Sequence, residues 1–216
     1  MHLFFDLDGT LTDPKEGITR CMQYALEKLG APVPTMDELL WCIGPPLHEN
    51  FRRLVGDERA QAGVDFYRER FAHIGLFENA PYEGIHAVLQ ALTDDGHDLY
   101  LASSKALIFV ERILAKYELE PFFSHVYGAN LDGTLADKTE LLAHALAELS
   151  VLPAVAVMIG DRHHDIIGGR NNRMHTVGVA YGYGTCSELL DAGADVVVSQ
   201  PRQLPAALAG LDGAGG

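Results

Sequence analysis

Short runs of consecutive apolar residues recur along the chain, and they predict the strands of a buried sheet. The runs are continuous rather than alternating, as expected for parallel strands that helices cover on both faces. One run, at residues 125–130, is weaker than the others. The other predicted strands lie at residues 2–8, 98–104, 154–161, 176–182 and 195–199.

Amphipathic segments between these runs predict helices at residues 84–96, 106–120 and 138–150. The first segment stops at a glycine and the second stops before Pro121, which are common helix ends. From about residue 83 onward, strand and helix therefore alternate. This alternation predicts an α/β fold, with a doubly wound, Rossmann-like parallel sheet.

The segment that follows the first strand does not alternate. Helical patterns occupy residues 15–30, 35–44, 46–56 and 62–75, and no convincing strand separates them. We therefore expect a core domain formed by residues 1–14 and 82–216. Residues 15–81 are expected to form an inserted, all-helical cap domain, and residues 210–216 a frayed tail.

Composition and charge narrow the classes of function. The 216 residues are 48% hydrophobic, which is enough to bury a sizeable core. The formal net charge of −14 argues against binding to nucleic acid and to an anionic membrane, since both require a basic surface. No targeting segment is visible, and the three cysteines form no CxxC pair. We expect a cytoplasmic protein.

Acidic residues follow two of the predicted strands. Asp6 and Asp8 end the first strand, where residues i and i+2 point the same way and where parallel sheets bind ligands. Asp161 and Asp165 follow the strand at 154–161. Carboxylates that converge repel one another, and a divalent cation would offset that repulsion. Carboxylate oxygens suit a hard cation such as Mg²⁺ better than they suit zinc. A solvated turn would explain the first pair alone, and a helix N-cap plus a surface charge would explain the second.

Three further residues are candidates for binding an anion. Ser103 and Ser104 end a strand, where hydroxyl and backbone N–H groups suit a phosphate, although serine is also a common helix cap. Lys138 begins a predicted helix, and a surface lysine is the default interpretation of it. His163 and His164 lie between the second pair of acidic residues and are expected to be exposed loop residues rather than ligands.

In their order and spacing, these features resemble the haloacid dehalogenase superfamily, in particular its phosphatase branch. The matching stretches are "DLDGTLTD", "LASSK", Lys138 and "GDRHHD", and the helical insertion resembles the first type of cap in that family. The stretches "GDRHHDIIGG" and "GVAYGYG" are most similar to the phosphoglycolate phosphatase-like members.

The resemblance implies a role for each acidic residue. Asp6 would be the nucleophile that forms an aspartyl-phosphate, and Asp8 would be the general acid and base. Mg²⁺ would be held by Asp6, by the backbone carbonyl of Asp8 and by Asp161, with support from Asp165.

The resemblance also implies a substrate class and the residues that bind its phosphate. Ser103, Ser104 and Lys138 would bind the phosphoryl group of a small phosphorylated metabolite, in a monomer or a homodimer. A β-phosphoglucomutase-type phosphotransferase and a 5′-nucleotidase remain alternatives. A haloacid dehalogenase is disfavoured because it needs no acid at position 8, and a non-catalytic binding protein is disfavoured because every charged group that the reaction needs is present.

The pentapeptide Leu-Asp-Gly-Thr-Leu occurs twice, at residues 7–11 and 131–135. The residue before it is Asp6 in the first copy and Asn130 in the second, and a neutral amide cannot replace a carboxylate nucleophile. We therefore expect one active site, with the second copy forming a turn that leads to Lys138.

Overall fold

The computed structural model describes residues 1–212 of the chain. It divides into two compact units, one formed by Met1–Thr12 together with the chain from Pro81 onward, and the other by Asp13–Ala80. The first unit is an α/β domain and the second is almost entirely helical. Among the described residues, no helix is both long enough and apolar enough to span a membrane.

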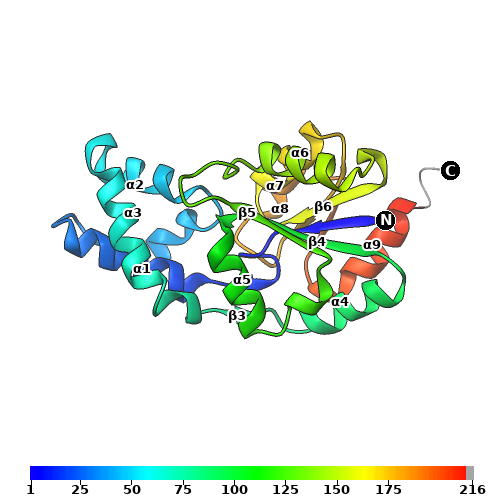
Figure 1. Ribbon diagram of the computed structural model, residues 1–216, viewed down its shortest axis with the longest axis horizontal. Helices are drawn as coiled ribbons and strands as arrows, with labels where there is room; N and C mark the ends of the chain where they lie inside the picture. The colour runs from blue at the N-terminus through cyan, green and yellow to red at the C-terminus, as the bar shows by residue number, and fades with distance from the viewer. Residues whose placement is uncertain (213–216) are drawn as a thin grey trace. The chain divides into compact units, whose positions relative to one another are not determined.

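A six-stranded parallel sheet forms the centre of the first unit, in the order β5-β4-β1-β6-β7-β8 (Figure 1). Each predicted strand is present, which confirms the doubly wound α/β fold. The strands are β1 (His2–Phe5), β4 (Asp98–Ala106), β5 (His125–Ala129), β6 (Ala156–Gly160), β7 (His175–Val179) and β8 (Val196–Val198).

Helices cover both faces of this sheet (Figure 1). One face carries α6 (Lys138–Leu149), α7 (His163–Asn171) and α8 (Cys186–Asp191), and the other carries α4 (Ile85–Asp94), α5 (Leu107–Lys116) and α9 (Leu204–Asp212). Three short 3₁₀ helices lie in the connections, at η3 (Glu120–Phe122), η4 (Pro153–Val155) and η5 (Pro201–Gln203).

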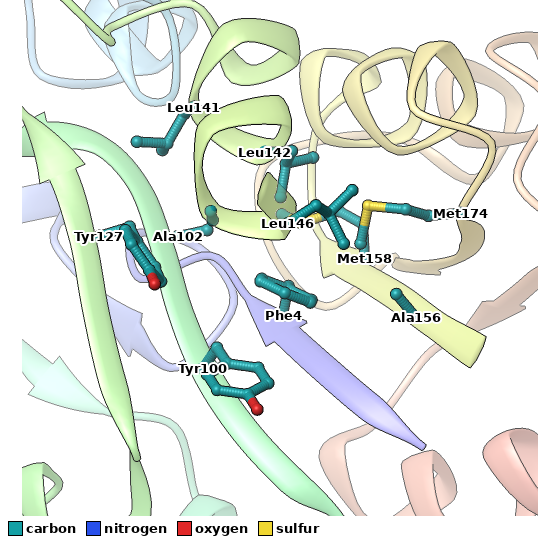
Figure 2. Packing of buried hydrophobic residues seen from close by; sticks show 11 residues of the cluster. Phe4, Tyr100, Ala102, Tyr127, Leu141, Leu142, Leu146, Ala156, Met158 and Met174 are labelled. Atoms are coloured by element: carbon teal, nitrogen blue, oxygen red, sulfur yellow. The ribbon is translucent and has the colours of Figure 1, made fainter. Parts of the chain in front are cut away.

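A buried apolar cluster joins the sheet to α6 (Figure 2). Phe4 of β1 pairs in register with Tyr100 of β4 and with Met158 of β6, so the three side chains lie side by side. Leu142 and Leu146 of α6 close over them. Because burial of each such side chain contributes about 1.5–3 kcal/mol, this cluster fixes the central strand whose end carries Asp6.

Some boundaries differ from those that the sequence predicts. Strand β4 runs to Ala106 instead of ending at Ser104, and α5 begins immediately afterwards. Helices α7, α8 and α9 were not expected as elements. The last of them includes residues 210–212, so the predicted frayed tail is wrong for those positions. The rest of that prediction, residues 213–216, lies outside the described residues.

The second unit contains the helices that the sequence predicts after the first strand. They are α1 (Lys15–Lys28), α2 (Leu47–Val55) and α3 (Asp57–Phe71), with 3₁₀ helices η1 (Asp37–Cys42) and η2 (Gly75–Phe77). The strands β2 (Thr12–Asp13) and β3 (Ala80–Pro81) pair as a separate two-residue ladder, which is too short for an apolar pattern to reveal.

Candidate active site

The site begins where the central strand β1 ends. The amide of Asp6 still donates to the carbonyl of Ile159 in β6, at 2.9 Å, and the chain then turns so that Leu11 N donates to Leu7 O at 2.9 Å. This turn leaves Asp6 and Asp8 only 6% and 8% exposed. At the turn, Gly9 has a φ of +84°, a conformation that glycine adopts without strain.

Three carboxylates converge at this edge of the sheet. Asp6 follows β1, Asp161 follows β6, and Asp165 lies in the first turn of α7. One oxygen from each lies within 4.8 Å of the others, and all three residues are buried. Their mutual repulsion in a buried environment requires compensating positive charge.

Lys138 supplies part of that charge. Its Nζ donates to Asp6 Oδ1 at 2.9 Å, to the carbonyl of Ala102 at 2.8 Å, and lies 2.8 Å from Asp165 Oδ1. Burial opposes the charged form of this lysine, but the carboxylates of Asp165 and Asp6 outweigh burial and raise its pKa above the ordinary value. Lys138 is therefore a buried cation and not the surface lysine of the default interpretation.

The remaining charge balance favours a cation. Burial raises the pKa of Asp165, and burial together with the Asp165 and Asp6 carboxylates raises the pKa of Asp161 well above its usual range. Among the described residues, Asp161 Oδ1 is buried and has no hydrogen-bond partner. An unsatisfied carboxylate oxygen inside a cluster of hard oxygen ligands fits a divalent cation such as Mg²⁺.

The serine pair lies differently from its predicted position. Ser103 is buried inside β4 and not at a strand-to-helix junction, and its hydroxyl accepts from the amide of Lys105 at 3.4 Å. Ser104 is half-buried, and among the described residues no hydrogen bond links it to the carboxylates. Lys105, which the matching stretch "LASSK" includes without an assigned role, forms an ion pair with Asp8 Oδ2. Burial raises the pKa of Asp8, while Lys105 opposes that shift.

The segment 161–165, which we call the metal loop after its two candidate metal ligands, Asp161 and Asp165, has its own set of partners. Asp161 Oδ2 accepts from Tyr183 N at 2.8 Å, and Asp165 Oδ2 accepts from Arg162 N at 3.1 Å. His163 Nδ1 lies 2.7 Å from the carboxylate of Glu188. His164 is half-buried, and burial together with the neighbouring cations lowers its pKa to about 4. The expectation that both histidines are exposed loop residues is therefore wrong, because both lie in the first turn of α7 and are partly covered.

Comparison with known proteins identifies the family. Residues 3–179 match the family described as haloacid dehalogenase-like hydrolase. The chain belongs to this family. It is 44% identical over 190 residues to a protein of Pseudomonas aeruginosa named 5′-nucleotidase, covering 87% of this chain and 86% of that protein. It is 39% identical over 197 residues to the tyrosine-protein kinase PtkA of Mycobacterium tuberculosis, covering 91% and 67%.

Comparison with solved structures agrees with this family assignment. The structure of a predicted phosphatase from Clostridium acetobutylicum superposes with a TM-score of 0.93 at 38% identity, covering 96% of this chain and 97% of that one. The family and these relatives make the protein an enzyme, a phosphatase of the haloacid dehalogenase-like hydrolases.

A second group of residues lies around the site of this hydrolase, in the stretch "GVAYGYG", for which the sequence predicts no role. The stretch after β7 contains Tyr181, whose hydroxyl donates to the carbonyl of Thr10 at 3.0 Å. A Cβ at Gly182 would lie 2.3 Å from the carbonyl oxygen of Gly9, so the two segments touch through their backbones. Alternation of glycine and tyrosine directly after a strand was the available signal, since such close approach requires glycine.

Glu188 also has no role predicted from the sequence, although its spacing from Thr185 indicates a helix cap. Thr185 and Glu188 match the Thr-x-x-Glu pattern of a capping box, and Thr185 Oγ1 does accept from Glu188 N at 3.0 Å. The carboxylate, however, extends to the metal loop. Hydrogen bonds from His163 and Arg162 outweigh burial and lower the pKa of Glu188 to about 2.

Two arginines of the helical unit have different kinds of partner. Arg70 forms paired hydrogen bonds with Glu78 at 2.7 and 2.9 Å and also reaches Cys21 Sγ at 3.2 Å. Arg53, in contrast, stacks over the ring of Trp41 with 4.1 Å between the guanidinium carbon and the ring centroid. Arg70 therefore links residues within that unit, while Arg53 makes a cation–π contact with Trp41.

Proposed function

We propose that the protein is a Mg²⁺-dependent phosphomonoester hydrolase that acts on a small phosphorylated metabolite through an aspartyl-phosphate on Asp6. The observation that carries this proposal is Lys138, a buried cation that lies between Asp6 and Asp165 at hydrogen-bond distance from both. A carboxylate nucleophile and a phosphate dianion repel each other, and a fixed cation beside the nucleophile reduces that repulsion.

The acidic cluster supports the proposed cation. Asp6, Asp161 and Asp165 would hold Mg²⁺ together with the backbone carbonyl of Asp8, and the unpartnered Asp161 Oδ1 is available for it. When bound, Mg²⁺ supplies positive charge that offsets the charge of the transferring phosphoryl group.

In the proposed first step, the Asp6 carboxylate attacks phosphorus while the bond between phosphorus and the leaving oxygen breaks. Asp8 donates its proton to that oxygen, so the product leaves as a neutral alcohol. A raised pKa, which burial gives to Asp8, suits a residue that must hold a proton before this step.

In the second step, Asp8 takes a proton from water, the water oxygen bonds to phosphorus, and the bond between phosphorus and Asp6 breaks. Inorganic phosphate leaves and the Asp6 carboxylate is restored. Ser103, Ser104 and Lys138 are the residues that we propose to hold the phosphoryl group during both steps, because positioning and charge compensation dominate phosphoryl transfer.

The proposed substrate class stays broad. The relative named 5′-nucleotidase favours a nucleoside monophosphate as a candidate beside phosphoglycolate, sugar phosphates and pyrophosphate. The relative named tyrosine-protein kinase keeps phosphoryl transfer to an acceptor other than water as a second candidate. We propose that the helical unit selects the substrate, and that the enzyme is cytoplasmic, in keeping with its three cysteines, which form no disulfide among the described residues.

A phosphate-release assay tests the proposal. An aryl phosphate should be hydrolysed in Mg²⁺ and should not be hydrolysed after chelation, and activity should return when Mg²⁺ is added again. Robust turnover in excess chelator would contradict the metal mechanism. A panel of phosphorylated metabolites, ranked by kcat/KM, then identifies the preferred substrate.

A further inference from the structure

We propose that Glu188 is a positioning residue that holds the metal loop in the conformation that binds the divalent cation. This inference rests on the proposed function, because it concerns the affinity of the same cation site. Glu188 lies in α8 and does not belong to the acidic cluster itself.

A single oxygen of Glu188 fixes two consecutive residues of the metal loop. Glu188 Oε1 accepts from the amide of His163 at 3.1 Å and from Arg162 Nε at 3.0 Å, and it lies 2.7 Å from His163 Nδ1. The side chains of Arg162 and Glu188 are only 13% and 25% exposed. Charge-assisted hydrogen bonds that are shielded from water in this way are stronger and more directional than those on an open surface.

The two residues that Glu188 holds lie between the two ligands of the loop. Arg162 directly follows Asp161, and its amide donates to Asp165 Oδ2 at 3.1 Å. A shift of Arg162 would therefore move both carboxylates relative to each other. Since Mg²⁺ requires near-ideal octahedral geometry, such a shift should weaken binding of the ion.

Charge gives Glu188 a second effect on the site. The Arg162 guanidinium interacts electrostatically with the Asp161 carboxylate, which we propose as a ligand, and an unpaired cation there would oppose the arrival of Mg²⁺. The Glu188 carboxylate neutralises that guanidinium. The arginine of "GDRHHD" is thus explained by a partner 26 residues further along the chain.

The segment that carries Glu188 is itself fixed against the loop. Thr185 caps α8 and accepts from the amide of Glu188 at 3.0 Å, while Tyr183 N donates to Asp161 Oδ2 at 2.8 Å. A Cβ at Gly184 would lie 2.0 Å from the carbonyl oxygen of Asp161, so the backbones are in direct contact. One stretch of chain therefore holds the loop at positions 161, 162 and 163.

Direct titration of Mg²⁺ into chelator-treated protein tests this role without depending on turnover. We expect Glu188→Gln to bind Mg²⁺ about 10- to 100-fold more weakly than the unaltered protein, as is typical when a group that orients metal ligands is removed. In assays, the Mg²⁺ concentration that gives half-maximal activity should rise by the same factor, while kcat at saturating Mg²⁺ falls less.

Asp195→Asn is the matched control. The Asp195 carboxylate also accepts from a backbone amide, that of Thr176 at 2.8 Å, and lies beside a histidine, His175, at 3.7 Å. It serves the first residues of β7 instead of the metal loop. We expect this variant to melt at a lower temperature and to bind Mg²⁺ like the unaltered protein.

Two outcomes would overturn the inference. The first is an unchanged Mg²⁺ affinity in Glu188→Gln. The second is an equal loss of Mg²⁺ affinity in Glu188→Gln and in Asp195→Asn, because that result would point to general destabilisation. If Glu188→Gln folds poorly, Glu188→Asp applies the same test, because it keeps the charge but shortens the reach. If the unaltered protein itself binds no Mg²⁺, the proposed function fails; if it binds Mg²⁺ and Glu188→Gln binds equally well, only the role of Glu188 fails.

A double variant separates geometry from charge. Arg162→Thr combined with Glu188→Gln removes the guanidinium that Glu188 neutralises. Recovery of Mg²⁺ affinity relative to Glu188→Gln alone would assign the loss to unpaired charge, and persistent weakness would assign it to the released loop; either result supports the role of Glu188.

Discussion

The pentapeptide Leu-Asp-Gly-Thr-Leu follows strand β1 at residues 7–11 and strand β5 at residues 131–135. Both copies therefore lie at the carboxyl edge of one parallel sheet. β1 lies between β4 and β6, whereas β5 lies at one edge of the sheet (Figure 1). All five residues of the first copy are buried, and the first four of the second are exposed.

The two aspartates differ accordingly. Burial raises the pKa of Asp8, whose carboxylate pairs with Lys105. Asp132 instead accepts from the amide and hydroxyl of Thr134 in its own turn, at 2.9 and 2.8 Å, and these hydrogen bonds lower its pKa. The two turns share a pentapeptide but differ in two ways: the first follows an inner strand and is buried, and it is preceded by Asp6 where the second is preceded by Asn130.

We expect the largest effect on kcat from substitutions of the residue that precedes each copy. Asp6→Asn should lower kcat by at least about 10³-fold, because an amide cannot form the aspartyl-phosphate. Asn130→Asp should leave kcat unchanged, and it should not restore activity when combined with Asp6→Asn. Steady-state phosphate release measures both, with circular dichroism to verify folding. Activity regained in the double variant would mean that the second copy can act as a site.

The next effect concerns Lys138. This residue follows the second copy in the sequence and lies beside the acidic cluster. Lys138→Met leaves the carboxylates of Asp6 and Asp165 without their shared cation, so in chelator the free energy of unfolding should fall by about 3–5 kcal/mol. Urea denaturation measures this change. Lys116→Met, which replaces an exposed lysine of α5, should stay within about 0.5 kcal/mol of the unaltered protein. Equal losses in the two variants would show that Lys138 is not a buried structural cation.

The glycines at the centre of each copy give the third effect. Both adopt left-handed conformations, with φ of +84° at Gly9 and +91° at Gly133. A Cβ at Gly9 would lie 2.1 Å from Asp161 Oδ2, whereas a Cβ at Gly133 would meet nothing within 4 Å. Gly133→Ala should therefore cost about 1–2 kcal/mol for the backbone conformation alone. Gly9→Ala should cost about 1–3 kcal/mol more because of the clash.

The same pair of variants should differ in Mg²⁺ binding, which can be followed by calorimetry. Gly9→Ala displaces the Asp161 carboxylate and should weaken binding, and Gly133→Ala should not. Equal free energies of unfolding and equal Mg²⁺ affinities in the two variants would contradict the close packing between Gly9 and Asp161.

The strands and the acidic cluster could be predicted from sequence because their signals are local. Strands buried on both faces require continuous apolar runs, as at Leu3, Phe4 and Phe5, which are fully buried. Acidic residues at the ends of such runs then have to meet at one edge of the sheet. Asp6, Asp161 and Asp165 were found in this way.

The missing parts depend on long-range contacts. Helix α7 contains Gly168 and Gly169, which weaken a helical pattern but leave room for Lys138 and Met158 to pack closely. The ion pair of Lys105 with Asp8 depends on the register between β4 and β1. The hydrogen bond between Arg162 and Glu188 depends on where α8 packs. No periodicity encodes these pairings, so the acidic residues of the cluster could be named from the sequence while the partners that contact them could not.

The smallest expected effect lies in the second copy. Asp132→Ala should leave kcat and Mg²⁺ affinity unchanged and lower the melting temperature slightly at neutral pH, because it removes the acceptor for Thr134. The pKa of Asp132 lies below its ordinary value in the folded protein, so its stabilisation is complete above the unfolded pKa of about 4 and is lost as the pH falls through the lower, folded value. The difference in melting temperature between the variant and the unaltered protein should therefore shrink in acid. Thermal melts at several pH values between neutral and acidic measure this difference in melting temperature. A difference that grows in acid would contradict the prediction, because it would mean that the fold favours the protonated form of Asp132, as burial does for Asp8 in the first copy.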